Sequence, residues 1–287
     1  DIKKSDRSLN TPIFKKNIFE QIIKDLRFSF KINNDDNLIK FTKSLTKPLS
    51  EFHFNINKRG IVRMDYANKT NQIIYVLRYF HAYWYQINYA LNIIKEDLFL
   101  DSNPQRELRI ALFAAGPAPE LIGITRFLEA NPNKFPSVSI DLFDQEGEWE
   151  FARQTFLFSN GKKNLLENNL NIKIKTYSIR LDNLIDLKNF KVKNYYDVVS
   201  FQNCLNEFWD NLGTSGDKFF SILDAIKPSG FAIFTDRDTR NTVKPFNEIK
   251  QLAYHKQYEI SLDIDYEKFD ALNDSPLPEI LSNGNFY

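Results

Sequence analysis

Short apolar runs alternate with longer segments of helical periodicity along most of the chain. Apolar runs of strand length lie at 108–113, 138–143, 198–201 and 231–235. At 172–178, Ile172, Ile174, Thr176 and Ser178 alternate with other residues, which predicts a half-exposed strand. Between these strand segments, apolar positions recur at helical spacing, as they do from Glu120 onward. Continuous apolar runs of this length are typical of buried parallel strands. The pattern predicts an α/β fold: a twisted, mostly parallel sheet with helices on both faces.

The first hundred residues predict a mainly helical extension of that fold. Apolar positions follow helical spacing from Phe14 to Leu26, whereas 42–46 and 52–57 are less regular. The segment 73–94 contains no Gly or Pro, and Thr70 or Asn71 is suited to cap it. We therefore expect a helical region, 1–100, that contacts a substrate or partner, and a ligand-binding α/β domain, 101–287.

Composition and charge narrow the function classes. Hydrophobic residues make up 43% of the chain and the formal net charge is +1, which fits a folded core without a strong global field. The single cysteine, Cys204, excludes a disulfide framework and a cysteine-based zinc site, so we expect no metal. No apolar run approaches the roughly 20 residues of a membrane span. We expect a cytoplasmic protein with no membrane partner.

Residues 1–60 carry 13 Lys and Arg against 7 Asp and Glu. Two interpretations stay open: a helical cap with a solvated basic face, or a surface for an anionic partner such as RNA.

The stretch 114–119, AAGPAP, joins the first buried strand to a helix through small or rigid residues. Strand, tight turn and helix form the unit that cradles nucleotides in doubly wound folds, since small side chains admit the ligand to the backbone. In a dinucleotide fingerprint the three glycine positions would be Ala114, Gly116 and Pro119. Proline has no N–H to offer a pyrophosphate, which disfavours a nicotinamide oxidoreductase.

The same turn resembles motif I of the class I S-adenosylmethionine (SAM)-dependent methyltransferases, a G-x-G-P-G-x-E-like sequence. Ala114, Gly116, Pro117, Ala118 and Glu120 stand at its defined positions, with alanine at two of the three glycines. The resemblance implies a Rossmann-like methyltransferase domain over 101–287. It also implies that Ala114, Ala115, Gly116 and Ala118 contact the cofactor, SAM.

Further motifs of that family follow in order. The strand 138–143 is followed by Asp144 and Gln145, and Ala152 lies eight residues after Asp144. In the family an acidic residue here accepts hydrogen bonds from the ribose hydroxyls, and the alternative is that Asp144 caps a helix over 146–158. Asp182, with Ser178 second, is the candidate for the adenine amino group.

The segment 196–208, YDVVSFQNCLNEF, resembles motif IV. Its strand ends at Gln202 and Asn203, which are expected to contact the cofactor's amino-acid part or the substrate. Asn206 and Glu207 occupy the positions of a histidine–aspartate pair in small-molecule O-methyltransferases, and they are our candidate catalytic residues. Asparagine takes no proton at neutral pH, so O-methylation by a histidine base is disfavoured.

Other motif IV variants, N-P-P-Y, D-P-P-Y and a cytosine-type cysteine motif, are absent, and Cys204 is interpreted as core. The turn 227–230, KPSG, resembles the one before strand five of the family. A helix over 217–226 precedes it, and Asp236, Arg237 and Asp238 follow the strand as substrate-facing residues or a charged loop. A helix over 243–257 and a strand over 258–264 complete the expectation.

The helix before motif I is rich in aromatic residues, including Tyr75, Tyr79, Tyr83 and Tyr89. They either pack against the sheet or line the substrate mouth. Leu77–Tyr83 also resembles the corresponding helix of the ribosomal small-subunit methyltransferase-like group.

Together these motifs predict SAM-dependent methyl transfer to a small molecule, RNA or protein. The alternative is a catalytically inactive methyltransferase-fold subunit that acts as a scaffold.

Overall fold

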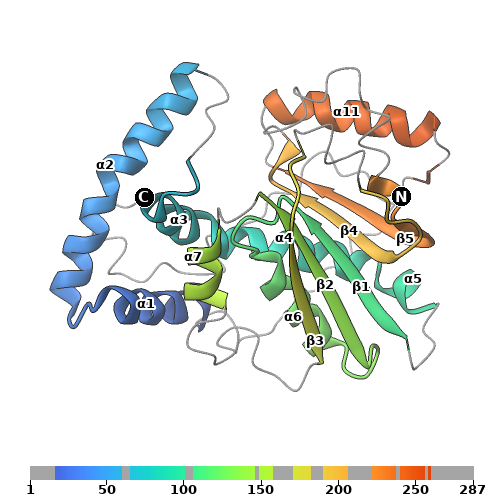
Figure 1. Cartoon of the computed structure of the whole chain (residues 1–287), viewed down its shortest axis with the longest axis horizontal. Coiled ribbons are helices and arrows are strands. Elements are labelled where there is room, and N and C mark those ends of the chain that lie inside the picture. The colour runs from blue at the N-terminus through green and yellow to red at the C-terminus, as the bar shows by residue number, and fades with distance from the viewer. Residues whose placement is uncertain are drawn as a thin grey trace, which may run out of the picture.

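The computed structural model describes residues 17–59, 65–100, 106–145, 149–157, 171–181, 190–205, 222–236, 240–255 and 258–259. Its centre is a five-stranded sheet in the order β3-β2-β1-β4-β5, with every neighbouring pair parallel. The strands are β1 (Glu107–Phe113), β2 (Ser137–Asp144), β3 (Ile172–Ser178), β4 (Tyr196–Gln202) and β5 (Ile226–Thr235). The predicted α/β class with a Rossmann-like sheet is confirmed (Figure 1).

Strand β1 lies at the middle of the sheet and sets its register. It pairs with β2 from Glu107 opposite Ser137 to Phe113 opposite Phe143. On its other side it pairs with β4, where Phe113 lies opposite Phe201. From β1 the chain first adds strands on one side of the sheet and then, from β4, on the other, so the strand order reverses between β1 and β4. Ligands of open α/β sheets bind beside the carboxyl ends of the strands at such a point.

Side chains of β1 alternate between two hydrophobic cores, one on each face of the sheet. Leu108, Ile110 and Leu112 pack into a core shared with helices α4 (His81–Ile93) and α6 (Glu120–Ala130). Ala111 and Phe113 face the other core, to which helix α11 (Arg240–His255) contributes Ile249. Both faces are thus covered, which explains why the strands read as continuous apolar runs.

Helices α4 and α6 approach each other closely at Gly123. A Cβ added at Gly123 would lie 2.2 Å from the main-chain oxygen of Trp84 and 2.4 Å from Cγ2 of Ile87. The side-chain amide of Asn88 donates a hydrogen bond to the Gly123 carbonyl at 3.0 Å. The aromatic helix of the N-terminal region is therefore fixed on the helix that follows the small-residue turn.

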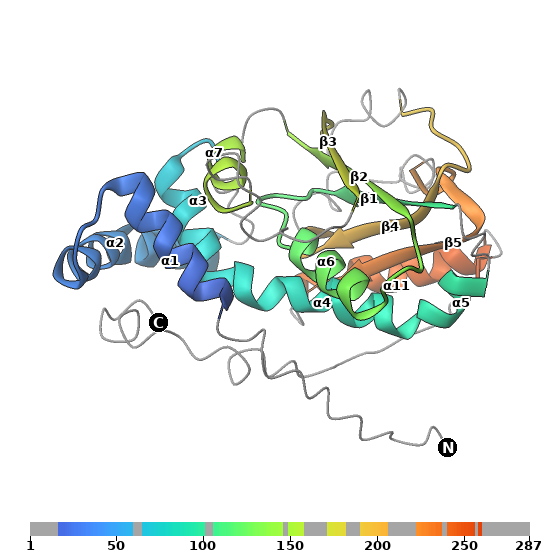
Figure 2. The same ribbon diagram turned by 90° about the horizontal axis from the view of Figure 1, so that it is seen from below.

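The other helices of the N-terminal region are α1 (Asn17–Phe30), α2 (Asp35–Arg59), α3 (Lys69–Tyr75) and α5 (Lys95–Leu100). Helices α1 and α2 lie at the end of the molecule away from the sheet (Figure 2). The segments that are less regular in sequence, 42–46 and 52–57, belong to α2. No helix of the described part is long and apolar enough to cross a membrane.

The predicted helix over 73–94 differs in detail. It starts at Lys69 with Asn68 as its cap, and a π-helical segment, η1 (Val76–Phe80), separates α3 from α4. The helix expected over 146–158 is described as α7 (Glu150–Ala152) followed by a second π-helical segment, η2 (Arg153–Leu157). Helix α1 packs against η2, and α3 packs against α7.

The predicted turn at 227–230 is wrong in its position, because these residues lie inside β5. Tyr196 pairs with Ile226 and Val198 pairs with Phe231, so the four residues 227–230 oppose Asp197 alone as a bulge. Ile226 also belongs to this strand rather than to the helix expected over 217–226. Most of the strand expected over 258–264 lies outside the described residues.

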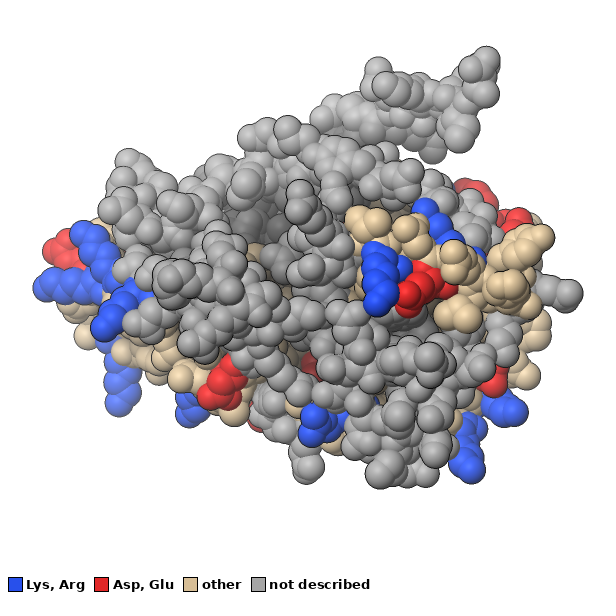
Figure 3. Space-filling model, turned by 90° about the horizontal axis from the view of Figure 1, so that it is seen from above, with Lys and Arg blue, Asp and Glu red and all other residues tan. Residues whose placement is uncertain are grey.

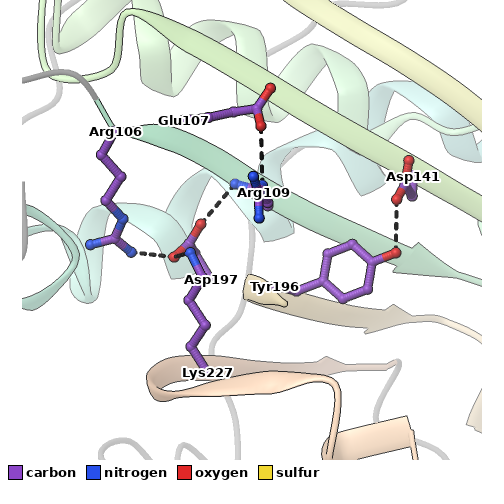
Figure 4. A network of polar contacts seen from close by, with 7 residues as sticks. All are labelled: Arg106, Glu107, Arg109, Asp141, Tyr196, Asp197 and Lys227. Carbon is purple, nitrogen blue, oxygen red and sulfur yellow. Dashed lines mark hydrogen bonds and ion pairs between the residues drawn. The ribbon is translucent and has the colours of Figure 1, made fainter. Parts of the chain in front are cut away.

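A buried carboxylate, that of Asp197, joins the amino ends of strands β1, β4 and β5 (Figure 4). Asp197 is fully buried and accepts hydrogen bonds from Lys227 Nζ at 2.7 Å, from the Arg109 main-chain N–H at 2.8 Å and from the Arg106 guanidinium. Next to it, Tyr196 donates to Asp141 Oδ2 at 2.7 Å. Two cations thus neutralise Asp197 and hold the bulge of β5 to β1.

We expect Asp197→Ala to lower the free energy of unfolding by about 3–5 kcal/mol, because it leaves two partly buried cations without their shared carboxylate. The matched control is Glu107→Ala in the same network, whose ion pair with Arg109 is only partly buried, with an expected loss below about 1 kcal/mol. Urea denaturation of both variants measures the difference. Equal losses would contradict the role given to Asp197.

Candidate functional site

The small-residue turn after β1 has three residues in the left-handed region. Ala114, Gly116 and Ala118 have φ of 50°, 53° and 57°. The Ala118 N–H closes the turn by donating to the Ala115 carbonyl at 2.7 Å, and helix α6 starts at Glu120. Glycine adopts a left-handed backbone without strain. The three positions of the motif I glycines are therefore the positions of this turn where glycine would be the least strained residue.

Asp144 at the end of β2 lies against this turn. Its carboxylate accepts hydrogen bonds from the main-chain N–H of Gly116 and, at 2.7 Å, from that of Gln145. The cap of α7 is Trp149 and it makes no side-chain cap hydrogen bond, so the alternative that Asp144 caps this helix is wrong. The structure therefore brings Ala114, Ala115, Gly116, Ala118, Asp144 and Gln145 together.

Two further ionisable side chains, Arg153 and Glu120, are buried beside Asp144. Arg153 donates through Nε to the Gly116 carbonyl at 2.7 Å, and its Nη2 lies 3.5 Å from Asp144 Oδ2. Burial lowers the pKa of Arg153, while the charges of Asp144 and Glu120 raise it. Burial raises the pKa of Glu120 to about 8, against the lowering effects of its main-chain hydrogen bond and of Arg153. Near neutral pH, Glu120 is therefore mostly protonated.

Trp149 covers the side of Gly116 on which a side chain would stand. A Cβ added at Gly116 would lie 3.5 Å from the Cε2 atom of this indole. The ring of Tyr75 lies 5.1 Å from that of Trp149, and Tyr66 lies 4.5 Å from it on another side. The turn therefore lies against an indole to which the N-terminal region adds the rings of Tyr66 and Tyr75.

The carboxyl end of β4 carries two buried amides that α4 orients. Gln202 donates through Nε2 to the Tyr83 carbonyl at 2.6 Å, and Asn203 donates through Nδ2 to Gln86 Oε1 at 2.7 Å. Among the described residues no donor lies on Gln202 Oε1 or Asn203 Oδ1, nor on Glu120 Oε2. Asn203 itself has a φ of 53°. Buried acceptors without hydrogen-bond partners are rare in native proteins, and Asp141 Oδ1, outside this site, is another one among the described residues.

Three predicted site residues, Asp182, Asn206 and Glu207, lie outside the described residues, as do Arg237 and Asp238. Ser178 is exposed at the end of β3, beside Asp144 in the strand pairing. Cys204 is buried in the core, as expected. Asp236 accepts a hydrogen bond from the Leu205 N–H at 3.0 Å, so it supports the chain after β4.

Sequence reasoning missed Glu120 as a buried acid, and it missed Trp149, Arg153 and Gln86. An arginine in the apolar run 151–158 was a usable signal, because a charge there needs a buried partner. In the part of the chain that the structure describes, no group of His, Cys, Asp and Glu is arranged to hold a metal ion.

Comparison with known proteins gives only distant similarity. No protein-family model and no curated protein matches the sequence. Among solved structures, a candidate SAM-dependent methyltransferase of Methanococcus maripaludis is 15% identical, with a TM-score of 0.37 over 69% of this chain and 78% of its own. The YcgJ protein of Bacillus subtilis is 13% identical, with a TM-score of 0.31 over 55% of this chain.

An O-methyltransferase family protein of Burkholderia thailandensis is 15% identical, with a TM-score of 0.33 over 59% of this chain. The matches span 58% of the Bacillus protein and 44% of the Burkholderia protein. At this identity and overlap, the similarity supports no conclusion about the cofactor or substrate of this chain.

Ala114→Gly is expected to leave the free energy of unfolding unchanged or raise it by up to about 1 kcal/mol, because relief of left-handed strain offsets the greater entropy of the unfolded chain. Ala115→Gly, one residue along and outside the left-handed region, is expected to lose about 0.5–1 kcal/mol. Urea denaturation compares the two. A larger loss for Ala114→Gly would contradict the conformation of the turn.

Glu120→Gln is expected to change how stability depends on pH. Between the unfolded pKa near 4.3 and the folded value of about 8, the folded protein holds one proton more than the unfolded chain. This group therefore makes the free energy of unfolding fall as pH rises through that window, and the variant lacks the fall. Urea unfolding midpoints from pH 5 to 9 measure this difference, with Glu150→Gln, at an exposed position, as the control. If stability falls with pH equally in Glu120→Gln and in the unmodified protein, the burial of a protonated Glu120 is refuted.

Proposed function

We propose that the chain binds SAM at the turn after β1 and transfers its methyl group to an acceptor. The observation that carries this proposal is the pairing of a left-handed, small-residue turn with the Asp144 carboxylate at the point where the strand order reverses. The proposal rests on this geometry and on the order of the sequence motifs.

The nucleoside half of SAM fits the β1–β2 side of the site. A carboxylate offers about four lone-pair positions, so Asp144 is able to accept from a ribose diol while it holds the Gly116 and Gln145 N–H groups. Arg153 fixes the turn from behind by its bond to the Gly116 carbonyl. The side chains at 114, 115 and 118 are small, and the indole of Trp149 lies beside Gly116. Asp182 stays our candidate for the adenine amino group.

The amino-acid half fits the β4 side. An ammonium group has three N–H donors and no acceptor, and the site offers buried acceptor oxygens on Gln202 and Asn203. The orientation of Gln202 is fixed because a main-chain carbonyl accepts from its nitrogen, which leaves Oε1 as the acceptor. Glu120 adds a carboxyl group at the start of α6.

Bound SAM would supply an electrophilic methyl group whose departure leaves a neutral sulfur. The chain's task is then to position the acceptor and exclude water, which is worth several kcal/mol without any proton transfer. No histidine side chain is described at the carboxyl end of β4, in keeping with an acceptor that needs no strong base. Asn206 and Glu207, which follow this strand in sequence, stay the candidates for orienting the acceptor.

The acceptor itself stays open between a small molecule, RNA and protein. Lys24 on α1, Lys31 directly after it and Lys40 on α2 are exposed. The space-filling view shows Lys and Arg gathered at that end of the molecule with some acidic neighbours (Figure 3). A surface for an anionic partner on residues 1–60 therefore stays a prediction. A scaffold that does not bind SAM is the competing function.

Isothermal titration calorimetry with SAM tests the proposal. We expect binding by the unmodified protein and a loss of affinity of about tenfold or more in Asp144→Ala, from the roughly 1.5–3 kcal/mol of a charged hydrogen bond. Asp141→Asn is the control, since Asp141 faces Tyr196 rather than the turn. No binding at about 1 mM SAM would favour the scaffold, and unchanged affinity in a folded Asp144→Ala would refute the ribose contact.

A further inference from the structure

Five aromatic side chains form a continuous cluster beside the proposed site. We call it the aromatic cluster; its members are Tyr66, Tyr75, Tyr79, Tyr83 and Trp149. Tyr75 is central, with ring centroids 6.0 Å from Tyr66, 5.1 Å from Tyr79, 6.2 Å from Tyr83 and 5.1 Å from Trp149. Tyr79 stacks on Tyr83 at 5.4 Å with an angle of 14° between the rings.

The aromatic cluster reaches from one half of the proposed site to the other. At one end Trp149 packs on Gly116, the residue whose N–H holds Asp144. At the other end the Tyr83 carbonyl accepts from Gln202, at the carboxyl end of β4. The group that joins the nucleoside and amino-acid halves of SAM is its sulfonium, which would lie between these two ends.

The charges that surround the turn do not by themselves favour a cation. Asp144 is paired with Arg153, and Glu120 is mostly protonated near neutral pH. The amides of Gln202 and Asn203 are neutral. The acceptor oxygens of Gln202 and Asn203 are assigned above to the ammonium group, and aromatic faces are a further feature able to attract a sulfonium, because a cation within about 6 Å of a ring centroid is stabilised by the ring quadrupole.

A π-helical segment places these rings. Segment η1 carries Tyr79 and lies between Tyr75 at the end of α3 and Tyr83 in α4. In a regular helix, residues four apart stand one above the other on one face, and the wider π-helical turn changes the directions of the rings on either side of it. Such segments occur often at functional sites. Here Tyr75, Tyr79 and Tyr83 lie before, in and after the segment, and their rings are in contact.

We propose that the aromatic cluster recognises the positive charge of the sulfonium, so that the site binds SAM more tightly than its demethylated, neutral-sulfur product, S-adenosylhomocysteine. This inference rests on the proposed function and adds to it a way of releasing product. The two ligands differ only in the methyl group and the charge it creates, so their affinity ratio reports the recognition of that charged methyl group, and substitutions in the cluster assign it to the rings.

Calorimetric titration with both ligands tests the inference. We expect the unmodified protein to bind SAM about fivefold or more tightly than S-adenosylhomocysteine. An analogue in which a carbon bearing an ammonium replaces the sulfonium should bind like SAM. Tyr75→Leu and Tyr83→Leu should move the ratio toward one while binding of S-adenosylhomocysteine persists, which also shows that the variants are folded. Tyr75→Phe and Tyr83→Phe keep a ring and should keep the ratio.

The control is Tyr89→Leu, on the same helix α4 but outside the cluster, which should leave the ratio unchanged. Equal affinities for the two ligands in the unmodified protein would overturn the inference while leaving the proposed function intact. An unchanged affinity ratio in both leucine variants would also overturn the inference and leave the proposed function intact. Failure of both ligands to bind the unmodified protein would instead overturn the proposed function, and with it the inference. If the leucine variants do not fold, the affinity ratio of the unmodified protein and its affinity for the charged analogue still test the inference.

Discussion

The contact between the Asp144 carboxylate and the Gly116 N–H is the interaction on which the site depends. It ties the end of β2 to the turn that follows β1, and Arg153 holds both partners from the other side. A turn with three left-handed residues, two of them alanine, is costly, and it persists only where its surroundings determine it. Here the surroundings are a buried ion pair, the start of α6 and the indole of Trp149.

The two edges of the sheet use buried charge differently. At the amino ends of the strands, Asp197 accepts from two cations and a main-chain N–H, and every one of these partners belongs to the scaffold. At the carboxyl ends, Glu120, Gln202 and Asn203 keep acceptor atoms to which no described residue donates. Satisfied polar groups stabilise a fold, whereas unsatisfied ones cost free energy until a ligand meets them. The network at the amino ends also includes Asp141 Oδ1, to which no described residue donates, so what separates the two ends is the pair of cations on Asp197 and not a full set of hydrogen-bond partners.

Much of this arrangement could be predicted from the sequence because it is local. The run 108–113, the small residues after it and the acid that ends β2 are each encoded within a few positions, and β3 occupies the predicted range 172–178. The contacts that complete the site join distant parts of the chain. Gln202 meets Tyr83 across 119 residues and Arg153 meets Gly116 across 37, and no periodicity reports such pairings. The π-helical segments and the bulge in β5 were missed for the same reason, since tertiary contacts decide them.

The central claim is that an adenosine-bearing ligand lies between Gly116 and Asp144. The chain has only nine glycines, so selective ¹⁵N-glycine labelling gives a spectrum in which each amide can be assigned by substitution. On titration with S-adenosylhomocysteine, the account predicts that the Gly116 amide resonance shifts. Gly230, in the bulge of β5 at the opposite edge of the sheet, should not respond. A ligand-induced shift at Gly230 without one at Gly116, or no shift at millimolar ligand, would contradict it.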